Sequence, residues 1–222
     1  QMWHGLAHVK TAEHPHRPTP PLRMRADGRR APETIAIDPS PEVLDYVRQL
    51  GERADRVAAK QVTPEEDNML KISGDGRKAA LDIRMVDDAA IPTSVPLAVV
   101  ADHIARIHRD HKDDVFTDPR TGEESPLRGA LQIVFCDLGT PNKDRWNVYD
   151  ELKAQLVTRG VPEGGIRFAH EAKNDKEKAR LFAAAREGRV AVLIGSTSKM
   201  GVGTNVQLRA RALHDVDCPW RP

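Results

Sequence analysis

Residues 189–207 read RVAVLIGSTSKMGVGTNVQ, a stretch that joins a short apolar run to a loop of small and polar residues. The run VAVLI at 190–194 is short, rich in β-branched side chains and bounded by glycine, which predicts a buried strand over residues 189–196. The glycines that follow allow close approach of the backbone to a ligand and unusual dihedral angles. We therefore interpret residues 195–207 as a candidate ligand-binding loop, with a plain strand-to-helix connection as the alternative.

The same pattern, a short apolar run followed by a polar loop, continues on both sides of this stretch. Further strands are predicted at LQIVF (131–135), GIRFAH (165–170) and LRARALHDVD (208–217). Amphipathic helices are predicted between them over residues 144–160 and after Asn174, which has Glu177 three residues on as a capping partner. Short apolar strands alternating with amphipathic helices are typical of βα units, so the sequence predicts an α/β fold with a parallel sheet.

The front half of the chain has a different character. Residues 1–39 are rich in Pro, His and Arg and are expected to form an extended or partly disordered lead-in. A helix is predicted after Ser40 and Pro41, with Val43, Val47, Leu50, Ala54 and Val57 on its inner face. A capping box at residues 63–66 is predicted to open a second helix that stalls at the glycines of 73–76, and a further helix spans 92–113. The expected division is 1–39 lead-in, 40–126 helical extension and 127–222 α/β lobe.

Bulk composition narrows the class of protein. The 222 residues contain 34 Lys and Arg against 33 Asp and Glu, a net charge of +1, so any nucleic-acid surface must be local. The two cysteines, Cys136 and Cys218, are far apart, which argues against a disulfide framework or a zinc ribbon and suits a reducing compartment. Because no signal peptide or membrane-spanning run is visible, we expect a soluble, cytoplasmic protein without membrane partners.

Ligands of open parallel sheets bind beyond the carboxyl ends of the strands, so the loops there are the places to search. Candidate phosphate-binding donors in these loops are Thr140, Asn142 and Lys143 after the first strand and Ser196, Thr197, Ser198 and Lys199 after the third. For residues 140–143 a simple turn with a helix cap is an equally good interpretation. Arg209 and Arg211 are expected on a solvated face.

Several catalytic patterns are missing or incomplete. The chain has no GxxxxGK[ST] phosphate loop and no acidic box after a strand, so it cannot by itself hydrolyse ATP in the usual way. Its histidines lack the cysteines or carboxylates that would complete a metal site, so we predict no metal site. A triad of Ser196, His170 and Asp217 is rejected because no GxSxG elbow surrounds the serine.

Three blocks in order carry a family resemblance: LQIVFCDLGTP (131–141), the stretch 166–207, and ALHDVDCPWRP (212–222). Together they resemble the second RecA-like lobe of superfamily 2 DNA helicases of the SNF2-like branch, and most closely the large helicase and DNA-methylase polypeptides of plasmids and phages. The resemblance covers most of the chain from about residue 64. It implies a RecA-like, P-loop NTPase-like lobe of three layers with a helical N-terminal extension.

The resemblance also assigns roles to residues. It implies contacts with DNA phosphates from helicase motifs IV and V, through Gly139, Thr140, Lys143, Ser196, Thr197 and Lys199. It places Gly201, Gly203 and Asn205 at the nucleotide side of the cleft. ATP and Mg²⁺ would bind jointly with an N-terminal RecA-like lobe of the same polypeptide, which would supply the Walker lysine, and motif VI would follow Pro222. His214-Asp215 departs from the His-His usual in relatives.

The function expected from the resemblance is the C-terminal lobe of an ATP-dependent DNA helicase or translocase. Two alternatives from other classes stay open. A non-catalytic DNA or protein interaction module would bind DNA in a salt-dependent way without depending on Thr140 or Thr197. A Rossmann-like enzyme domain would bind a dinucleotide or S-adenosylmethionine at the glycines, although Gly201 lies several residues beyond its strand, unlike the usual GxGxxG position.

Overall fold

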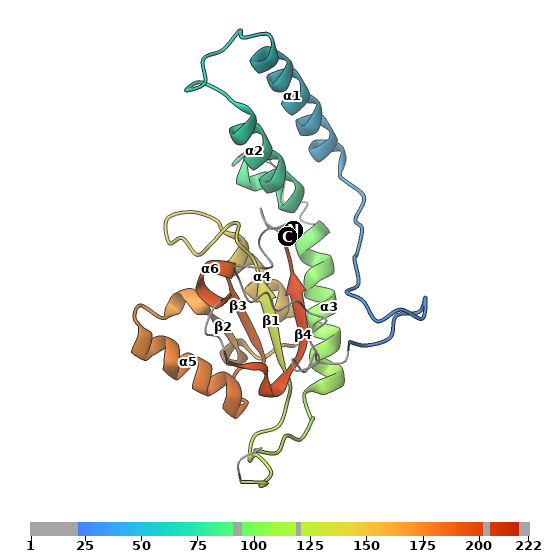
Figure 1. The fold of residues 1–222 in the computed structure, drawn as a ribbon, viewed down its shortest axis with the longest axis vertical. Helices are drawn as coiled ribbons and strands as arrows, with labels where there is room; N and C mark the ends of the chain where they lie inside the picture. The colour runs from blue at the N-terminus through green and yellow to red at the C-terminus, as the bar shows by residue number, and fades with distance from the viewer. Residues whose placement is uncertain (1–21, 91–94, 119–120, 202–204, 218–222) are drawn as a thin grey trace, which may run out of the picture. The chain divides into compact units, whose positions relative to one another are not determined.

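The computed structural model describes residues 22–90, 95–118, 121–201 and 205–217 (Figure 1). The chain divides into two compact units, residues 1–37 and residues 38–222. In the first unit, residues 22–37 contain neither helix nor strand. A turn interrupts this segment, where the N–H of Gly28 donates to the carbonyl of Arg25 at 3.0 Å. The described part of the predicted lead-in is therefore without regular secondary structure.

Four parallel strands form the sheet of the second unit, in the spatial order β2-β3-β1-β4. Their bounds are β1 Leu131–Phe135, β2 Ile166–Phe168, β3 Val192–Gly195 and β4 Ala210–Asp215. All four predicted strands are present, each within its predicted range, and the α/β class is confirmed. The register aligns Phe135 at the end of β1 with Gly195 on one side and Asp215 on the other.

Helices cover both faces of this sheet. On one face, Val134 and Ile194 of the strands share a core with Leu97 of α3 (Val95–His111) and Leu152 of α4 (Val148–Thr158). On the other face, Leu193 packs with Leu181 and Phe182 of α5 (Asp175–Glu187). Burial from both sides explains the apolar runs by which β1 and β3 were predicted, whereas the edge strand β4 alternates partly buried and exposed residues. The result is a three-layer arrangement of helices, sheet and helix.

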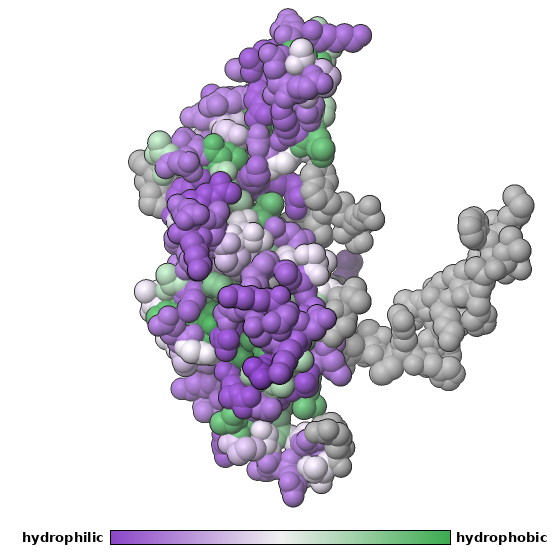
Figure 2. Space-filling model, turned by 90° about the vertical axis from the view of Figure 1, so that its left-hand side faces the viewer, coloured by the Kyte–Doolittle hydropathy of each residue, from purple (hydrophilic) through white to green (hydrophobic). Residues whose placement is uncertain are grey.

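Asparagine side chains begin the helices that follow β1 and β2. The side chain of Asn147 accepts from the N–H of Asp150 at the start of α4, and that of Asn174 accepts from the N–H of Glu177 at the start of α5. The second cap is the one predicted. On the face of Figure 2, hydrophilic residues predominate and the apolar patches are small, as expected where amphipathic helices turn their polar sides to solvent.

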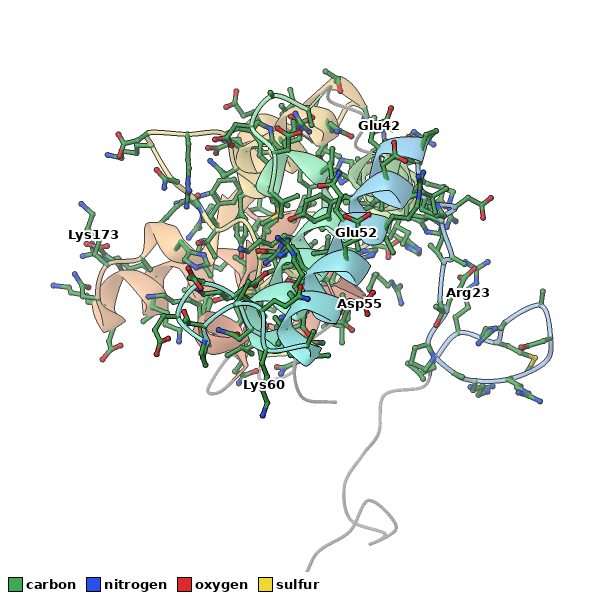
Figure 3. All side chains as sticks on the ribbon, turned by 90° about the horizontal axis from the view of Figure 1, so that it is seen from above. Arg23, Glu42, Glu52, Asp55, Lys60 and Lys173 are labelled. Carbon is green, nitrogen blue, oxygen red and sulfur yellow. The ribbon has the colours of Figure 1, made fainter. Side chains whose placement is uncertain are left out.

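A pair of helices precedes the sheet: α1 (Pro41–Ala58) and α2 (Met69–Leu81), which pack on each other. As predicted, Ser40 caps α1 and Leu50 is buried. Val47 was predicted on the inner face but is 53% exposed, so that prediction was wrong. Arg53 of α1 reaches across to Asp67 at 2.7 Å, which lowers the pKa of that carboxyl to about 2. Glu52, Asp55 and Lys60 of this segment are exposed, and Lys60 projects clear of the ribbon (Figure 3).

The start of α2 differs from the prediction. Thr63 and Glu66 do exchange the two hydrogen bonds of a capping box, but they close an isolated turn rather than open a helix. The helix begins at Met69 with Asn68 as its cap and runs without a break through Gly74 and Gly76 to Leu81. The predicted stall at residues 73–76 was wrong.

Helix α3 lies within the sequence range assigned to a helical extension, yet it packs on the sheet. Leu97, Ala101 and Ile104 are fully buried in the core that includes β1 and β3. The segment after α2 is also attached to the lobe, because the guanidinium of Arg84 lies 4.0 Å from the centre of the Trp146 ring. Helix α3 and the segment after α2 therefore both pack against the α/β lobe.

Arg209 forms a buried junction at the amino ends of the strands. It is 1% exposed, and its guanidinium donates to the carbonyls of Arg186 (2.9 Å), Gly129 (3.2 Å) and Leu127 (2.8 Å) and to the hydroxyl of Ser125. The prediction of a solvated face was wrong for this residue. A single side chain thus joins the end of α5, the approach to β1 and the start of β4.

Candidate nucleic-acid interface

The carboxyl ends of β1, β3 and β4 bring three loops together. Phe135, Gly195 and Asp215 are aligned across the sheet, and the ladder continues one step further. The N–H of Cys136 donates to the carbonyl of Gly195, and the N–H of Val216 donates to the carbonyl of Phe135, each at 3.0 Å. The next residue in each loop therefore lies at the same level beyond the sheet.

Two carboxylates connect these loops. Asp217, after β4, accepts from the backbone N–H groups of Asp137 (3.0 Å) and Leu138 (2.8 Å) in the loop after β1. Asp137 in turn accepts from the backbone N–H of Thr197, after β3, at 2.6 Å. Sequence analysis missed both carboxylates as structural groups. The signal that could have identified them is their equal distance of two residues from the ends of neighbouring strands.

The loop after β1 holds three of the residues to which DNA contacts were assigned. Gly139 has φ +59°, and a Cβ atom there would lie 2.7 Å from Cβ of Val148, so its packing against α4 already requires glycine. Thr140 and Lys143 are exposed. The glycine therefore shapes the loop, while the hydroxyl and the ammonium group are accessible to a ligand.

The amino end of α4 is poorly suited to an anion. Its first turn carries Asp150 and Glu151, and the Asp150 carboxylate bonds to the side chain of the capping Asn147 at 2.6 Å. Negative side chains here already use the favourable end of the helix dipole. A phosphate near this loop would thus be held by Thr140 and Lys143 rather than by the helix terminus.

The loop after β3 offers a second group of donors. Ser196 is buried and its hydroxyl lies 2.9 Å from that of Ser198, whereas Thr197 and Lys199 are exposed on the short helix α6 (Thr197–Met200). The hydrogen bond from the N–H of Thr197 to Asp137 joins this group to the loop that carries Thr140. The two sets of sequence-predicted DNA contacts therefore lie on connected loops, with Ser196 buried.

One exposed lysine follows each of three adjacent strands at this edge. Lys143 follows β1, Lys199 follows β3 and Lys173 follows β2, where it projects outward at the start of α5 (Figure 3). The loops after β2 and β3 are close, because the turn Ala169–Glu171 contacts α6; burial and the charge of Lys199 lower the pKa of His170. The sequence reasoning did not select Lys173.

The two described candidate nucleotide-binding residues, Gly201 and Asn205, bond to different parts of the lobe. Gly201 ends α6 at the carboxyl edge, where its N–H donates to Thr197 at 2.6 Å, and it is exposed. Gly203 lies outside the described residues. Asn205 is exposed, but its carbonyl accepts from Arg186 in the last turn of α5 at 2.8 Å, beside the Arg209 junction at the amino ends of the strands.

The buried polar groups of the edge do not form a nucleophilic site. Tyr149 donates its hydroxyl to the carbonyl of Cys136 at 2.5 Å, and burial raises the pKa of both side chains. A thiol with a raised pKa stays protonated and unreactive at neutral pH. Ser196 and Asp217 bond to other partners, as described above, so the rejected hydrolytic triad is not assembled.

Within the described ranges, no group of three or more His, Cys, Asp or Glu side chains could hold a metal ion. In the same residues, no helix combines the length and the apolar character needed to cross a bilayer. No protein-family model matches the chain, and no curated protein or solved structure is significantly similar to it. The helicase resemblance therefore depends on the three sequence blocks alone.

Proposed function

We propose that this chain is the C-terminal RecA-like lobe of an ATP-dependent DNA helicase or translocase of superfamily 2, and that it provides DNA-phosphate contacts and one wall of an ATP cleft. The observation that carries the proposal is the hydrogen bond between Thr197 and Asp137. It joins the two loops to which the resemblance assigns motifs IV and V, although about sixty residues separate them in the sequence. A binding surface made from both loops requires this proximity.

The lysines of the carboxyl edge support a phosphate ligand. Lys143, Lys199 and Lys173 each follow one of three adjacent strands, and such a row suits the spaced charges of a nucleic-acid backbone. The chain as a whole has a net charge of only +1, so attraction must come from this local row. Exposed Thr140 and Thr197 add neutral donors between the ammonium groups, as phosphate-contacting surfaces commonly do.

The residues present do not hold the ATP phosphates and Mg²⁺ by themselves. The two carboxylates of the carboxyl edge, Asp137 and Asp217, are both occupied by backbone N–H groups. In the proposal, a first RecA-like lobe provides the lysine and the metal-binding carboxylates, which together stabilise charge on the transferred phosphoryl group. Among the described candidates, Gly201 is the one at the edge that would face this cleft.

The proposal is tested by fluorescence anisotropy with a labelled single-stranded oligonucleotide. We expect that Thr140→Ala and Thr197→Ala each weaken binding several-fold, while Thr158→Ala, an exposed threonine at the far end of α4, has no effect. With three lysines on phosphates, log Kd should change with log salt with a slope of roughly 2. Binding that is salt-dependent but unaffected at both Thr140 and Thr197 would instead indicate a general interaction module.

Nucleotide titrations separate the remaining possibilities. The isolated chain is expected to bind ATP weakly and not to hydrolyse it, because the catalytic groups belong to the other lobe. ATPase activity that is lost on substitution of Gly203 or Asn205 would contradict the proposal. Tight binding of NAD or S-adenosylmethionine would support the Rossmann-like enzyme domain in its place.

A further inference from the structure

Three residues at equal sequence distance from the strand ends meet above the sheet. Phe135, Gly195 and Asp215 are aligned, and two residues beyond them lie Asp137, Thr197 and Asp217. Because parallel strands in register bring equivalent positions to the same level, the side chain of one loop can reach the backbone of the next. The carboxylate of Asp217 connects the loop after β4 to the loop after β1, and the carboxylate of Asp137 connects the loop after β1 to the loop after β3.

We propose that Asp217 and Asp137 are positioning residues that form a carboxylate relay, holding the loops after β1 and β3 in the arrangement that contacts DNA phosphates. The relay is defined as the three hydrogen bonds from the N–H groups of Asp137 and Leu138 to Asp217 and from the N–H of Thr197 to Asp137. In this proposal neither carboxylate contacts DNA, because the negative DNA phosphates would repel it. The inference rests on the proposed function for its DNA readout and on the geometry for the relay itself.

The strength of these contacts supports a positioning role. Hydrogen bonds from backbone N–H groups to an ionised carboxylate are about twice as strong as those between neutral partners. The distances of 2.6 and 2.8 Å are at the short end of the range for such bonds. Burial raises the pKa of Asp217, and its two backbone hydrogen bonds oppose this rise. A carboxylate is kept half-buried here because it organises the backbone around it.

The relay acts on the residues that the proposed function uses. Asp217 fixes the backbone immediately before Gly139 and Thr140, and Asp137 fixes the first residue of α6, two positions before Lys199. Without the relay, each loop would sample its own conformations, and ordering both on binding would cost affinity. Loss of either carboxylate should therefore weaken binding at both loops.

The relay is tested first by the amide spectrum of the ¹⁵N-labelled chain. A hydrogen bond to a carboxylate moves an amide proton downfield, so Asp137→Asn should shift the Thr197 signal upfield. Asp217→Asn should shift the Asp137 and Leu138 signals and, through the relay, the Thr197 signal as well. Asp215→Asn, an exposed aspartate at the end of the same strand, is the matched control and should leave Thr197 unchanged. A Thr197 signal that stays in place in Asp217→Asn overturns the relay.

DNA affinity provides the second readout. Replacing a charged acceptor by a neutral one should weaken oligonucleotide binding about fivefold to tenfold, with the salt slope unchanged because the lysines remain. The double variant should lose little more than either single variant, and Asp217→Glu should recover part of the loss. Additive losses would mean that the carboxylates act independently and would overturn the relay. If the unsubstituted chain fails to bind DNA, the proposed function fails, and the amide shifts still decide whether the relay exists.

Discussion

Replacing Arg209 by methionine tests whether its buried guanidinium holds the amino edge of the sheet together. Methionine keeps much of the length and apolar volume of the side chain but removes every N–H donor. The substitution would leave the carbonyls of Arg186, Gly129 and Leu127 and the hydroxyl of Ser125 without this donor. Burial lowers the pKa of Arg209, so relief of that desolvation offsets part of the loss.

With four acceptors at roughly 1 kcal/mol each and the desolvation offset subtracted, the free energy of unfolding should fall by about 3 kcal/mol. For a chain of 222 residues this corresponds to a decrease of about 6–12 °C in melting temperature. Urea denaturation followed by circular dichroism measures the change. Arg211→Met is the matched control, since Arg211 is 52% exposed and its ion pair with Asp114 should contribute less than about 1 kcal/mol. If the two variants differ by less than about 1 kcal/mol, the junction is not a stabilising element.

Two further predictions concern stability. Gly139→Ala should destabilise the protein by about 3 kcal/mol, because φ is positive and the new Cβ would overlap Val148. Gly122→Ala is the control: φ is also positive there but the space around it is open, so the loss in the same urea assay should be only about 1 kcal/mol. Burial lowers the pKa of His214 to about 4, and its Nε2 lies 2.9 Å from Oε1 of Gln132. The folded protein therefore favours the neutral form of His214. Its contribution to the free energy of unfolding is complete above about pH 6.5 and is lost as the pH falls toward 4; the loss is roughly 2 kcal/mol at about pH 5. His214→Gln should flatten the pH dependence of the urea midpoint, and an unchanged slope in that variant would show that another group is responsible.

The central strands β1 and β3 followed from the sequence because burial on both faces leaves a strong local pattern. LQIVF at 131–135 is an apolar run interrupted only by Gln132, and the structure buries Leu131 to Val134 completely or nearly so. Helix α5 was equally predictable, since Asn174 and Glu177 are only three residues apart in the chain and cap it without help from distant residues. In these segments local sequence preference and tertiary packing favour the same secondary structure.

Helix α2 was misread because a distant contact decided it. Glycine lowers helix propensity by about 1 kcal/mol, which favoured a break at residues 73–76. In the structure, the position a Cβ would take on Gly76 lies 3.4 Å from Cδ1 of Leu50 on α1, so a small residue allows the two helices to approach closely. Arg53 adds an ion pair to Asp75 at 3.0 Å. Tertiary packing thus maintains a helix that the local sequence disfavours.

The polar residues were harder to interpret than the apolar ones, because the role of a charge depends on what the register places beside it. Arg209 and Arg211 are only two residues apart and look alike, yet one is buried among carbonyls and the other pairs with Asp114 at the surface. Asp215 and Asp217 form a similar pair, one exposed and one bonded to two backbone amides. Strand alternation would place residues two apart on the same face, so the difference in each pair follows from where β4 begins and ends: Arg209 precedes β4 (Ala210–Asp215) and Asp217 follows it. Once the alignment of β1, β3 and β4 is known, the same counting that identifies Asp137 and Asp217 predicts which loop residues can meet, so the register of the sheet is the missing information.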